Sequence, residues 1–139
     1  MEKTKRISII TVAYNSEDFI EDFIKSVLGY LGKDDELIIL DNNSSDKTLE
    51  IIQKYASNLT LVTSFQNLGF SKGNNMAVKK ALGKYLFFLN PDTEILEGTI
   101  DILFKFISSK KNLGAVSPLI LDKEGKVSSI QGSQHLTVP

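Results

Sequence analysis

Two aspartates follow apolar runs of strand length and are the first candidates for chemistry. Asp41 comes directly after residues 36–40, and Asp92 follows residues 84–89 with Pro91 before it. Proline has no N–H to donate, so the second run should stop there as a strand. In an open α/β sheet, ligands bind beyond the carboxyl ends of the strands, and a carboxylate there can hold a divalent cation through its oxygens. Asp92 is therefore a candidate metal ligand, and Asp41 repeats the pattern.

Each of these acids also has an explanation without a ligand. Asp92 or Thr93 could cap the following helix, and residues 41–46 could be a self-bonding turn in which Ser44 or Ser45 caps the next helix. Taken one at a time, such turns and caps are the commoner explanation. The case for a ligand rests on joint occurrence, because four strand ends carry acids, amides, an aromatic ring or glycines where one ligand could touch all of them.

The apolar periodicity predicts the elements that position these residues. Continuous β-branched runs alternate with segments whose apolar residues recur every three or four positions, so strands should alternate with amphipathic helices. The first helix should be capped by Asn15 or Ser16, and a loop with two glycines should occupy residues 66–75. We predict strands at residues 7–12, 36–40, 59–64 and 84–89, helices at 16–31, 47–55, 76–82 and 94–108, and two short strands at 114–121 and 127–130.

The order of these elements predicts an α/β fold with three layers, in which a mostly parallel sheet lies between helices. A strand order of 3-2-1-4, with which doubly wound sheets commonly begin, places the switch point between the first and fourth strands. Tyr14, Asp41 and Asp92 should then surround one crevice.

Composition narrows the class of protein. The chain has 139 residues with 42% hydrophobic content, which predicts one domain over residues 1–139. Sixteen basic and seventeen acidic residues leave a net charge of -1, which gives no electrostatic footprint for nucleic acid. There is no cysteine, and the first apolar run is too short for a signal segment or a membrane span. We therefore expect a cytoplasmic protein that does not bind nucleic acid.

Several familiar sites are absent from the sequence. It contains no G-x-G-x-x-G after the first strand, no P-loop motif and no G-x-S-x-G. The single histidine, His135, lies near the end of the chain and is interpreted as a solvated loop residue. A response-regulator receiver needs an acidic pair after its first strand, where this chain has Val12-Ala13-Tyr14. A receiver-like domain is the improbable alternative, and acetyl phosphate labelling of Asp41 or Asp92 would detect it.

Four motifs occur together in the order found in the family 2 glycosyltransferases, and the chain resembles that family. They are TVAYNSE at residues 11–17, DNNSSDKT at 41–48, NLGFSKGNN at 67–75 and LNPD at 89–92. The resemblance extends from Ile7 to about Leu121, and its nearest branch is the rhamnosyltransferase-like one. It implies a GT-A fold that binds a nucleotide-diphosphate sugar.

The resemblance also implies roles for single residues. Thr11, Ala13 and Tyr14 would line the nucleoside pocket, and Asp41 would accept a hydrogen bond from the base. Lys72 and the backbone of residues 69–73 would lie near the diphosphate or the sugar. Asn90 and Asp92 occupy the D-x-D positions, so Asp92 would bind Mg²⁺ or Mn²⁺. The substrate-binding residues expected in this way are Thr11, Ala13, Tyr14, Asn15, Glu17, Asp41, Lys72, Gly73, Asn90 and Asp92.

Two departures from the family pattern define the remaining expectations. Asn90 replaces the first acid of D-x-D, and an uncharged amide could be a weaker metal ligand or a sugar ligand. The family's acceptor half, with its general base, lies after the matched region, so the fold should be truncated before that half and the catalytic residues stay unknown. We expect the donor-binding portion of a longer enzyme that transfers sugar with inversion to a glycan or lipid-linked acceptor, as in cell-envelope polysaccharide biosynthesis.

The resemblance leaves two further points open. Peripheral membrane association of the full-length enzyme is compatible with a lipid-linked acceptor. The alternative to an enzyme is a non-catalytic nucleotide-sugar-binding or interaction module, for which the same donor residues would be used without transfer.

Overall fold

The computed structural model describes residues 5–122 and 124–127. The chain forms two compact units, Met1–Ile100 and Asp101–Pro139. The first unit contains the sheet and every residue proposed above as a ligand. That the two units together make one domain, as the composition suggests, stays a prediction.

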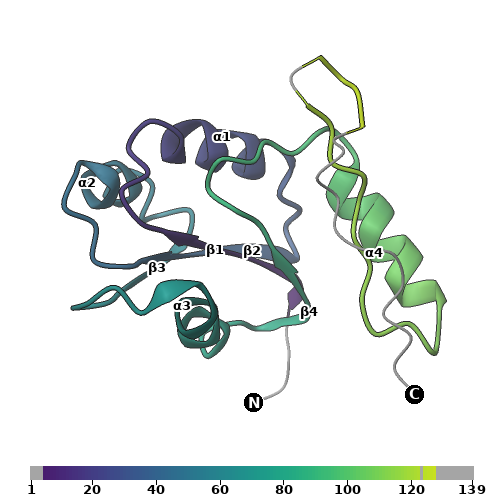
Figure 1. The fold of residues 1–139 in the computed structure, drawn as a ribbon. Helices are drawn as coiled ribbons and strands as arrows, with labels where there is room; N and C mark the ends of the chain where they lie inside the picture. Colours follow the sequence, from purple (N-terminus) through teal and green to yellow (C-terminus); the bar gives the residue numbers. More distant parts are fainter. Residues whose placement is uncertain (1–4, 123, 128–139) are drawn as a thin grey trace. The chain divides into compact units, whose positions relative to one another are not determined.

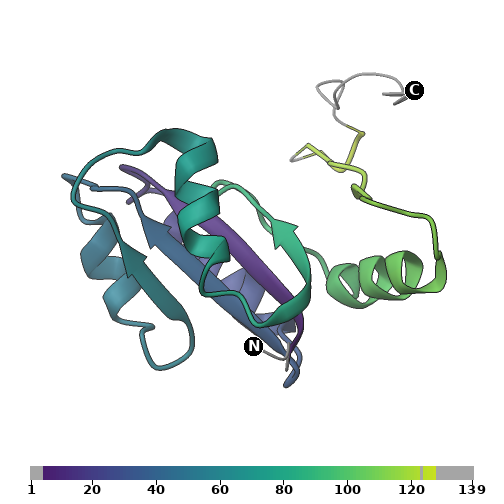
Figure 2. The same ribbon diagram turned by 90° about the horizontal axis from the view of Figure 1, so that it is seen from below.

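The first unit is built on a sheet of four strands in the order β3-β2-β1-β4, which confirms the predicted order (Figures 1 and 2). The strands are β1 (Lys5–Ala13), β2 (Asp35–Asp41), β3 (Thr60–Thr63) and β4 (Gly83–Phe88). All three pairings are parallel. Because β1 and β2 are buried on both faces, their sequences are continuous apolar runs rather than alternating ones.

Helices cover the sheet on both faces, which confirms the predicted three layers. Figure 1 shows α1 (Ile20–Tyr30) and α2 (Thr48–Gln53) on one side of the sheet and α3 (Gly69–Val78) on the other. One core lies between α1 and the sheet. The buried residues that α1 contributes to it are Ile20, Phe23, Ile24 and Val27. The second core lies under α3 and consists of Ile10, Ile38, Leu40, Val62 and Ala77. Even-numbered residues of β1 and β2 thus face α3, and odd-numbered ones face α1 and α2.

The first helix begins later than its periodicity predicts. The expected caps Asn15 and Ser16 are wrong, because α1 starts at Ile20 with Phe19 at the cap position and no side-chain cap bond. The Ser16 carbonyl accepts the N–H groups of Phe19 and Ile20 in a turn that precedes the helix. The polar residues before that turn bond instead to a neighbouring loop, as described below.

The third helix replaces most of a predicted loop. It spans Gly69–Val78, whereas the sequence suggested a loop at residues 66–75 and a helix at 76–82. Gly69 has a φ of +72°, a conformation that glycine adopts at no steric cost, and it begins the helix directly after Asn67 and Leu68. Two of the bonds at its start involve Asn42, the residue after β2, and local sequence did not indicate them.

The last helix, α4 (Thr99–Ser109), starts five residues later than predicted. A turn at residues 90–93 and Gly98, with a φ of +78°, hold the preceding segment out of helical geometry. After α4, residues 114–120 form no strand, contrary to expectation, and their side chains are mostly exposed. Within residues 114–122 and 124–127, an isolated antiparallel bridge joins Leu121 to Val127. Residues 128–130 of the second predicted strand, and His135, lie outside the described residues.

A helix that crosses a membrane must be both long and apolar. None of the helices in residues 5–122 and 124–127 combines the length and the apolar character needed to cross a bilayer.

Candidate functional site

The carboxyl ends of β1, β2 and β3 meet at one edge of the sheet. Ala13 lies opposite Asp41 in the β1–β2 pairing, and Asp41 lies opposite Thr63 in the β2–β3 pairing. The Asn42 N–H donates to the Ala13 carbonyl at 2.8 Å, so the pairing of β1 with β2 continues one residue beyond the end of β2. Tyr14 follows directly, and this residue is 47% exposed. The structure therefore places Ala13 and Asp41 side by side, with Tyr14 next in the chain. That Tyr14, Asp41 and Asp92 surround one crevice stays a prediction.

Asp41 is a buried carboxylate with one unpaired oxygen. The residue is only 2% exposed, and its Oδ2 accepts the Ser44 N–H at 3.3 Å. Its Oδ1 has no hydrogen-bond partner within the described part of the chain, and the same is true of the Thr11 hydroxyl oxygen. An unsatisfied buried polar group costs about 1–3 kcal/mol. Asp41 Oδ1 and Thr11 Oγ1 are thus the two atoms of this edge that most need a partner from outside the described protein.

The loop after β1 is bonded to the loop after β2. Three consecutive backbone N–H groups of the first loop donate to side chains of the second. These bonds join the N–H groups of Asn15, Ser16 and Glu17 to Ser44 Oγ at 3.1 Å, Thr48 Oγ1 at 2.7 Å and Asp46 Oδ2 at 3.1 Å, respectively. We call this set, together with the two return bonds described next, the inter-loop network.

Asn15 and Glu17, both predicted as ligands, accept hydrogen bonds from the loop after β2 through their side-chain oxygens. Asn15 Oδ1 accepts the Ser45 N–H at 2.9 Å, and Glu17 Oε2 accepts the Lys47 N–H at 2.9 Å. The structure therefore places these two side chains against the neighbouring loop. Their predicted contact with a substrate stays a prediction.

The environment of Asp46 shifts its pKa. Desolvation by burial acts to raise the pKa, but hydrogen bonds from the Thr48 side chain and N–H and from the Glu17 N–H outweigh it, so the pKa lies below its ordinary value of 3.8. Sequence reasoning did not single out Asp46 or Thr48, although both belong to the motif at residues 41–48. Motif membership does not tell which atoms a side chain will bond.

The lowered pKa of Asp46 predicts a pH-dependent effect of Asp46→Asn. A carboxyl whose folded pKa is lowered stabilises the fold fully above its unfolded pKa, here about 3.8, and loses that contribution as the pH falls through the folded value. We expect Asp46→Asn to lower the free energy of unfolding near neutral pH and to converge with the wild type in acid. Urea unfolding of both proteins across this range measures it, and a difference that does not change with pH would contradict the assignment.

The amino end of α3 is fixed to the same edge through two asparagines. Asn42, only 2% exposed, donates from Nδ2 to Asn67 Oδ1 at 2.9 Å and accepts the Leu68 N–H on its own Oδ1 at 2.9 Å. Asn67 Oδ1 also accepts the Gly69 N–H at 2.8 Å. Lys72 is exposed in the first turn of this helix. These bonds position the helix that carries Lys72, and sequence reasoning missed Asn42 and Asn67 as the residues responsible.

Gly73 has a packing role in the structure. A Cβ built on it would lie 3.0 Å from Val12 Cγ1 and 3.4 Å from Leu40 Cδ2, so the helix can approach the sheet this closely because the side chain is absent. The need for glycine here is explained by α3 packing on β1 and β2. A contact of the Gly73 backbone with a diphosphate stays a prediction.

Asn90 and Asp92 leave the sheet beside β1. Phe88 lies opposite Ile10, and the Leu89 N–H still donates to the Ile10 carbonyl at 3.0 Å before the chain turns. Both predicted ligands are exposed, and Asp92 borders a small cleft of about 50 Å³. The cleft is lined by Phe19, Asp22, Phe23, Pro91, Asp92, Thr93 and Glu94.

The donor set around Asp92 limits how a metal ion could be held. No group of three or more His, Cys, Asp or Glu residues with metal-binding geometry occurs in the described ranges. A complete protein cage is therefore not formed there. Mg²⁺ commonly binds through only one or two carboxylates, with substrate phosphates and waters as its other ligands. Asp92 fits that kind of site.

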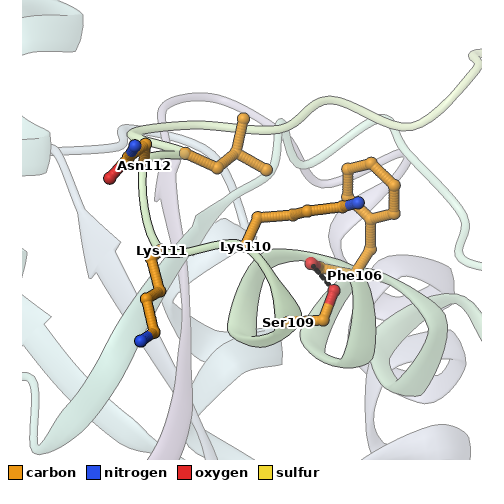
Figure 3. Close-up of a pocket in the computed structure, with 6 residues that line it drawn as sticks. Phe106, Ser109, Lys110, Lys111 and Asn112 are labelled. Atoms are coloured by element: carbon orange, nitrogen blue, oxygen red, sulfur yellow. Dashed lines mark hydrogen bonds between the residues drawn. The ribbon is translucent and has the colours of Figure 1, made fainter.

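A larger hollow lies in the second unit and contains none of the predicted ligands. It measures about 480 Å³ and is lined by Phe106, Ser109, Lys110, Lys111, Asn112 and Leu113 (Figure 3). The Lys110 ammonium lies 6.0 Å from the centre of the Phe106 ring, and Ser109 Oγ donates to the Phe106 carbonyl at 2.8 Å. None of its lining residues is a carboxylic acid, so the hollow offers no carboxylate ligand for a metal ion.

Comparison with known proteins identifies relatives. The family model described as Glycosyl transferase family 2 matches residues 8–135. The GalNAc(5)-diNAcBac-PP-undecaprenol beta-1,3-glucosyltransferase of Campylobacter jejuni is 29% identical over 130 residues, which cover 88% of this chain and 41% of that protein. The chain spans less than half the length of the curated relatives it matches.

Solved structures agree with the fold. TarS 1-349 of S. aureus in complex with UDP is 27% identical to this chain and superposes with a TM-score of 0.69. The match covers 81% of this chain and 38% of TarS 1-349. The mannosyltransferase PcManGT from Pyrobaculum calidifontis, in complex with GDP-Man and Mn²⁺, has a TM-score of 0.77 over 87% of this chain and 37% of its own, at 22% identity. These likenesses, with the sheet order, confirm the predicted GT-A fold. They do not single out the rhamnosyltransferase-like branch, which stays a prediction.

Proposed function

The chain belongs to glycosyl transferase family 2, and from this premise we propose that it binds the nucleotide-diphosphate sugar donor of a sugar transfer reaction. The observation that carries the proposal is the unpaired Oδ1 of buried Asp41 at the carboxyl edge of the sheet. A buried carboxylate oxygen needs a donor, and a nucleobase N–H can supply one. Because Oδ1 is closed to solvent, we infer that the base reaches it after a local shift of the surrounding loops.

The nucleoside pocket in this proposal is formed by Thr11, Ala13, Tyr14 and Asp41. Thr11, Ala13 and Asp41 share one face of the sheet, because Thr11 pairs with Ile39 and Ala13 pairs with Asp41. The half-exposed Tyr14 ring supplies an aromatic surface for a base. The Thr11 hydroxyl, which also lacks a partner in the described part, is a second group for the nucleoside or for a bridging water.

The diphosphate in this proposal lies between the start of α3 and the turn after β4. Lys72 provides a positive charge, and Asp92 holds a divalent cation, with Asn90 as a further ligand of the metal or the sugar. Mg²⁺ or Mn²⁺ bound there would neutralise the charge that grows on the diphosphate as the nucleotide leaves. The binding of GDP-Man and Mn²⁺ by PcManGT is compatible with this arrangement.

For the longer enzyme, the proposal covers inverting transfer to a glycan or lipid-linked acceptor of the cell envelope. The name of the Campylobacter jejuni relative includes a lipid-linked glycan, which supports an acceptor of this class. A cytoplasmic location and peripheral membrane association belong to the same proposal. The general base of the transfer is not assigned to a residue of this chain.

Calorimetric titration of the protein with UDP, dTDP and GDP, with and without Mn²⁺, tests the proposed donor site. We expect one of the three nucleotides to bind more tightly than the others. Absence of binding to the folded protein would contradict the proposal. Nucleotide-sugar binding by a full-length protein that transfers no sugar to any acceptor would instead favour the non-catalytic module.

Replacing Asp41 with asparagine should weaken binding of the preferred nucleotide. The substitution keeps the size of the side chain but removes the charge that strengthens a hydrogen bond from the base. We expect a loss of about tenfold in affinity, which corresponds to one hydrogen bond to a charged group. Ribose 5-phosphate, which has no base, should bind both proteins equally, and an equal loss for it would place Asp41 away from the base.

A further inference from the structure

We propose that Thr48 and Asp46 are positioning residues of the donor site, which act by holding residues 14–17, and with them Tyr14, at the nucleoside pocket. Neither residue is expected to touch the nucleotide. The inference rests on the proposed function, because it assigns a role to the loops around the same pocket.

Three consecutive backbone N–H groups of the β1–α1 loop point to acceptors within the protein. Successive backbone N–H groups next to a residue with positive φ can form a concave site for an anion, and Asn15 has a φ of 47°. Here the N–H groups of residues 15–17 are already bonded to the Ser44, Thr48 and Asp46 side chains. The Glu17 N–H bonds to a carboxylate oxygen of Asp46 and the other two N–H groups bond to hydroxyl oxygens, so all three are already engaged within the protein. This loop is therefore not the diphosphate site, and its bonds serve to hold its shape.

Asp46 and Thr48 connect this loop to the start of α2. Asp46 uses both carboxylate oxygens, since Oδ1 accepts the Thr48 N–H at 2.9 Å and Oδ2 accepts the Glu17 N–H at 3.1 Å. Thr48 is fully buried, and its hydroxyl oxygen accepts the Ser16 N–H at 2.7 Å. Thr48, the first residue of α2, and Asp46, just before the helix, therefore fix two adjacent N–H groups of the loop.

Tyr14 depends on these bonds because it lies between two fixed points. On one side, Ala13 is paired with β2 through the Asn42 N–H bond to its carbonyl. On the other side, Ser16 is held by Thr48, and Ser16 Oγ bonds to the Tyr14 carbonyl at 3.2 Å. If Ser16 is released, the chain after Tyr14 is held only by the exposed bonds of Asn15 to Ser44 and Ser45, and ligand binding must then supply part of the ordering of Tyr14.

Two substitutions of Thr48 separate the hydrogen bond from packing. Thr48→Val keeps the shape but removes the oxygen that accepts the Ser16 N–H, whereas Thr48→Ser keeps the oxygen. We expect Thr48→Val to weaken UDP binding about fivefold to tenfold and to speed amide hydrogen exchange at Ser16, and Thr48→Ser to restore both. If another nucleotide proves to be the ligand of the wild type, it replaces UDP in all titrations.

A matched variant controls for general destabilisation. Tyr55→Phe removes the 2.9 Å bond from Tyr55 Oη to Glu21 Oε1, which joins the turn after α2 to α1. We expect it to leave nucleotide binding unchanged at temperatures where all variants are folded. Equal losses in Thr48→Val and Tyr55→Phe, or in Thr48→Val and Thr48→Ser, would overturn the inference.

The test also distinguishes this inference from the proposed function. Faster exchange at Ser16 in Thr48→Val with unchanged nucleotide affinity would overturn the positioning role alone. Absence of nucleotide binding by the folded wild type would overturn the proposed function, and the positioning role with it.

Discussion

Replacing Gly83 with alanine is expected to lower the free energy of unfolding by about 3 kcal/mol or more. Gly83 begins β4 beside β1, and a Cβ on it would lie 2.6 Å from the Ile7 carbonyl carbon and from Ser8 Oγ, and closer still to the Ser8 nitrogen. Two of these three atoms belong to the backbone of β1, so no side-chain rotation can make room. The Gly83 N–H also donates to Ser8 Oγ at 2.8 Å, and displacement of the strand would break that bond.

Urea unfolding followed by circular dichroism measures this loss, and Gly29→Ala is its control. Gly29 is an exposed residue of α1, and nothing lies within 4 Å of a Cβ built on it. Alanine there should stabilise the protein by about 0.5–1 kcal/mol, because glycine is a poor helix former. A loss below about 1 kcal/mol for Gly83→Ala would mean that β4 can move away from β1 at little cost.

Replacing Asp92 with alanine is expected to abolish the effect of Mn²⁺ on nucleotide binding. If Asp92 is the protein's ligand for the cation, the variant should bind the nucleotide equally with and without Mn²⁺, and with the metal-free affinity of the wild type. In a full-length enzyme, loss of this charge stabilisation should lower kcat by about 10²–10³-fold, the range measured when one group that stabilises transition-state charge is removed. Calorimetry on this chain and initial rates on the longer enzyme give the two measurements.

Asp18→Asn is the matched control for Asp92→Ala. Asp18 is an exposed acid that precedes α1 and does not line the cleft beside Asp92. Its substitution removes one negative charge without touching the proposed site, so the Mn²⁺ effect should persist. If Mn²⁺ still strengthened nucleotide binding to Asp92→Ala, the cation would have to be bound elsewhere. If Asp18→Asn abolished the effect as well, the effect of Mn²⁺ on nucleotide affinity would depend on the net charge of the protein and not on Asp92 in particular.

Local sequence was enough to predict the four strands of the sheet, their order and the polar residues that follow them. Buried parallel strands require continuous apolar runs, and these are visible in local sequence at β1, β2 and β4. The order of elements then limits the sheet to a few topologies, because crossovers are right-handed and short. The confirmed order puts β2, which ends at Asp41, and β4, which precedes Asp92, on opposite sides of β1. That these acids and Tyr14 surround one crevice stays a prediction.

Only the tertiary structure decided where the helices begin and which polar groups remain for a ligand. The amino end of α3 is bonded to Asn42, 26 residues before Leu68 in the sequence, and the Ser16 N–H is bonded to Thr48, 32 residues after it. Asn15 and Glu17 are likewise engaged by residues 30 positions away, whereas Asp41 Oδ1 is left unpaired within the described residues. Periodicity and local caps report on neighbours within a few residues. A hydrogen-bond partner supplied by another loop is set by how the sheet brings the loops together, so the sequence indicated the residues of the site but not their roles.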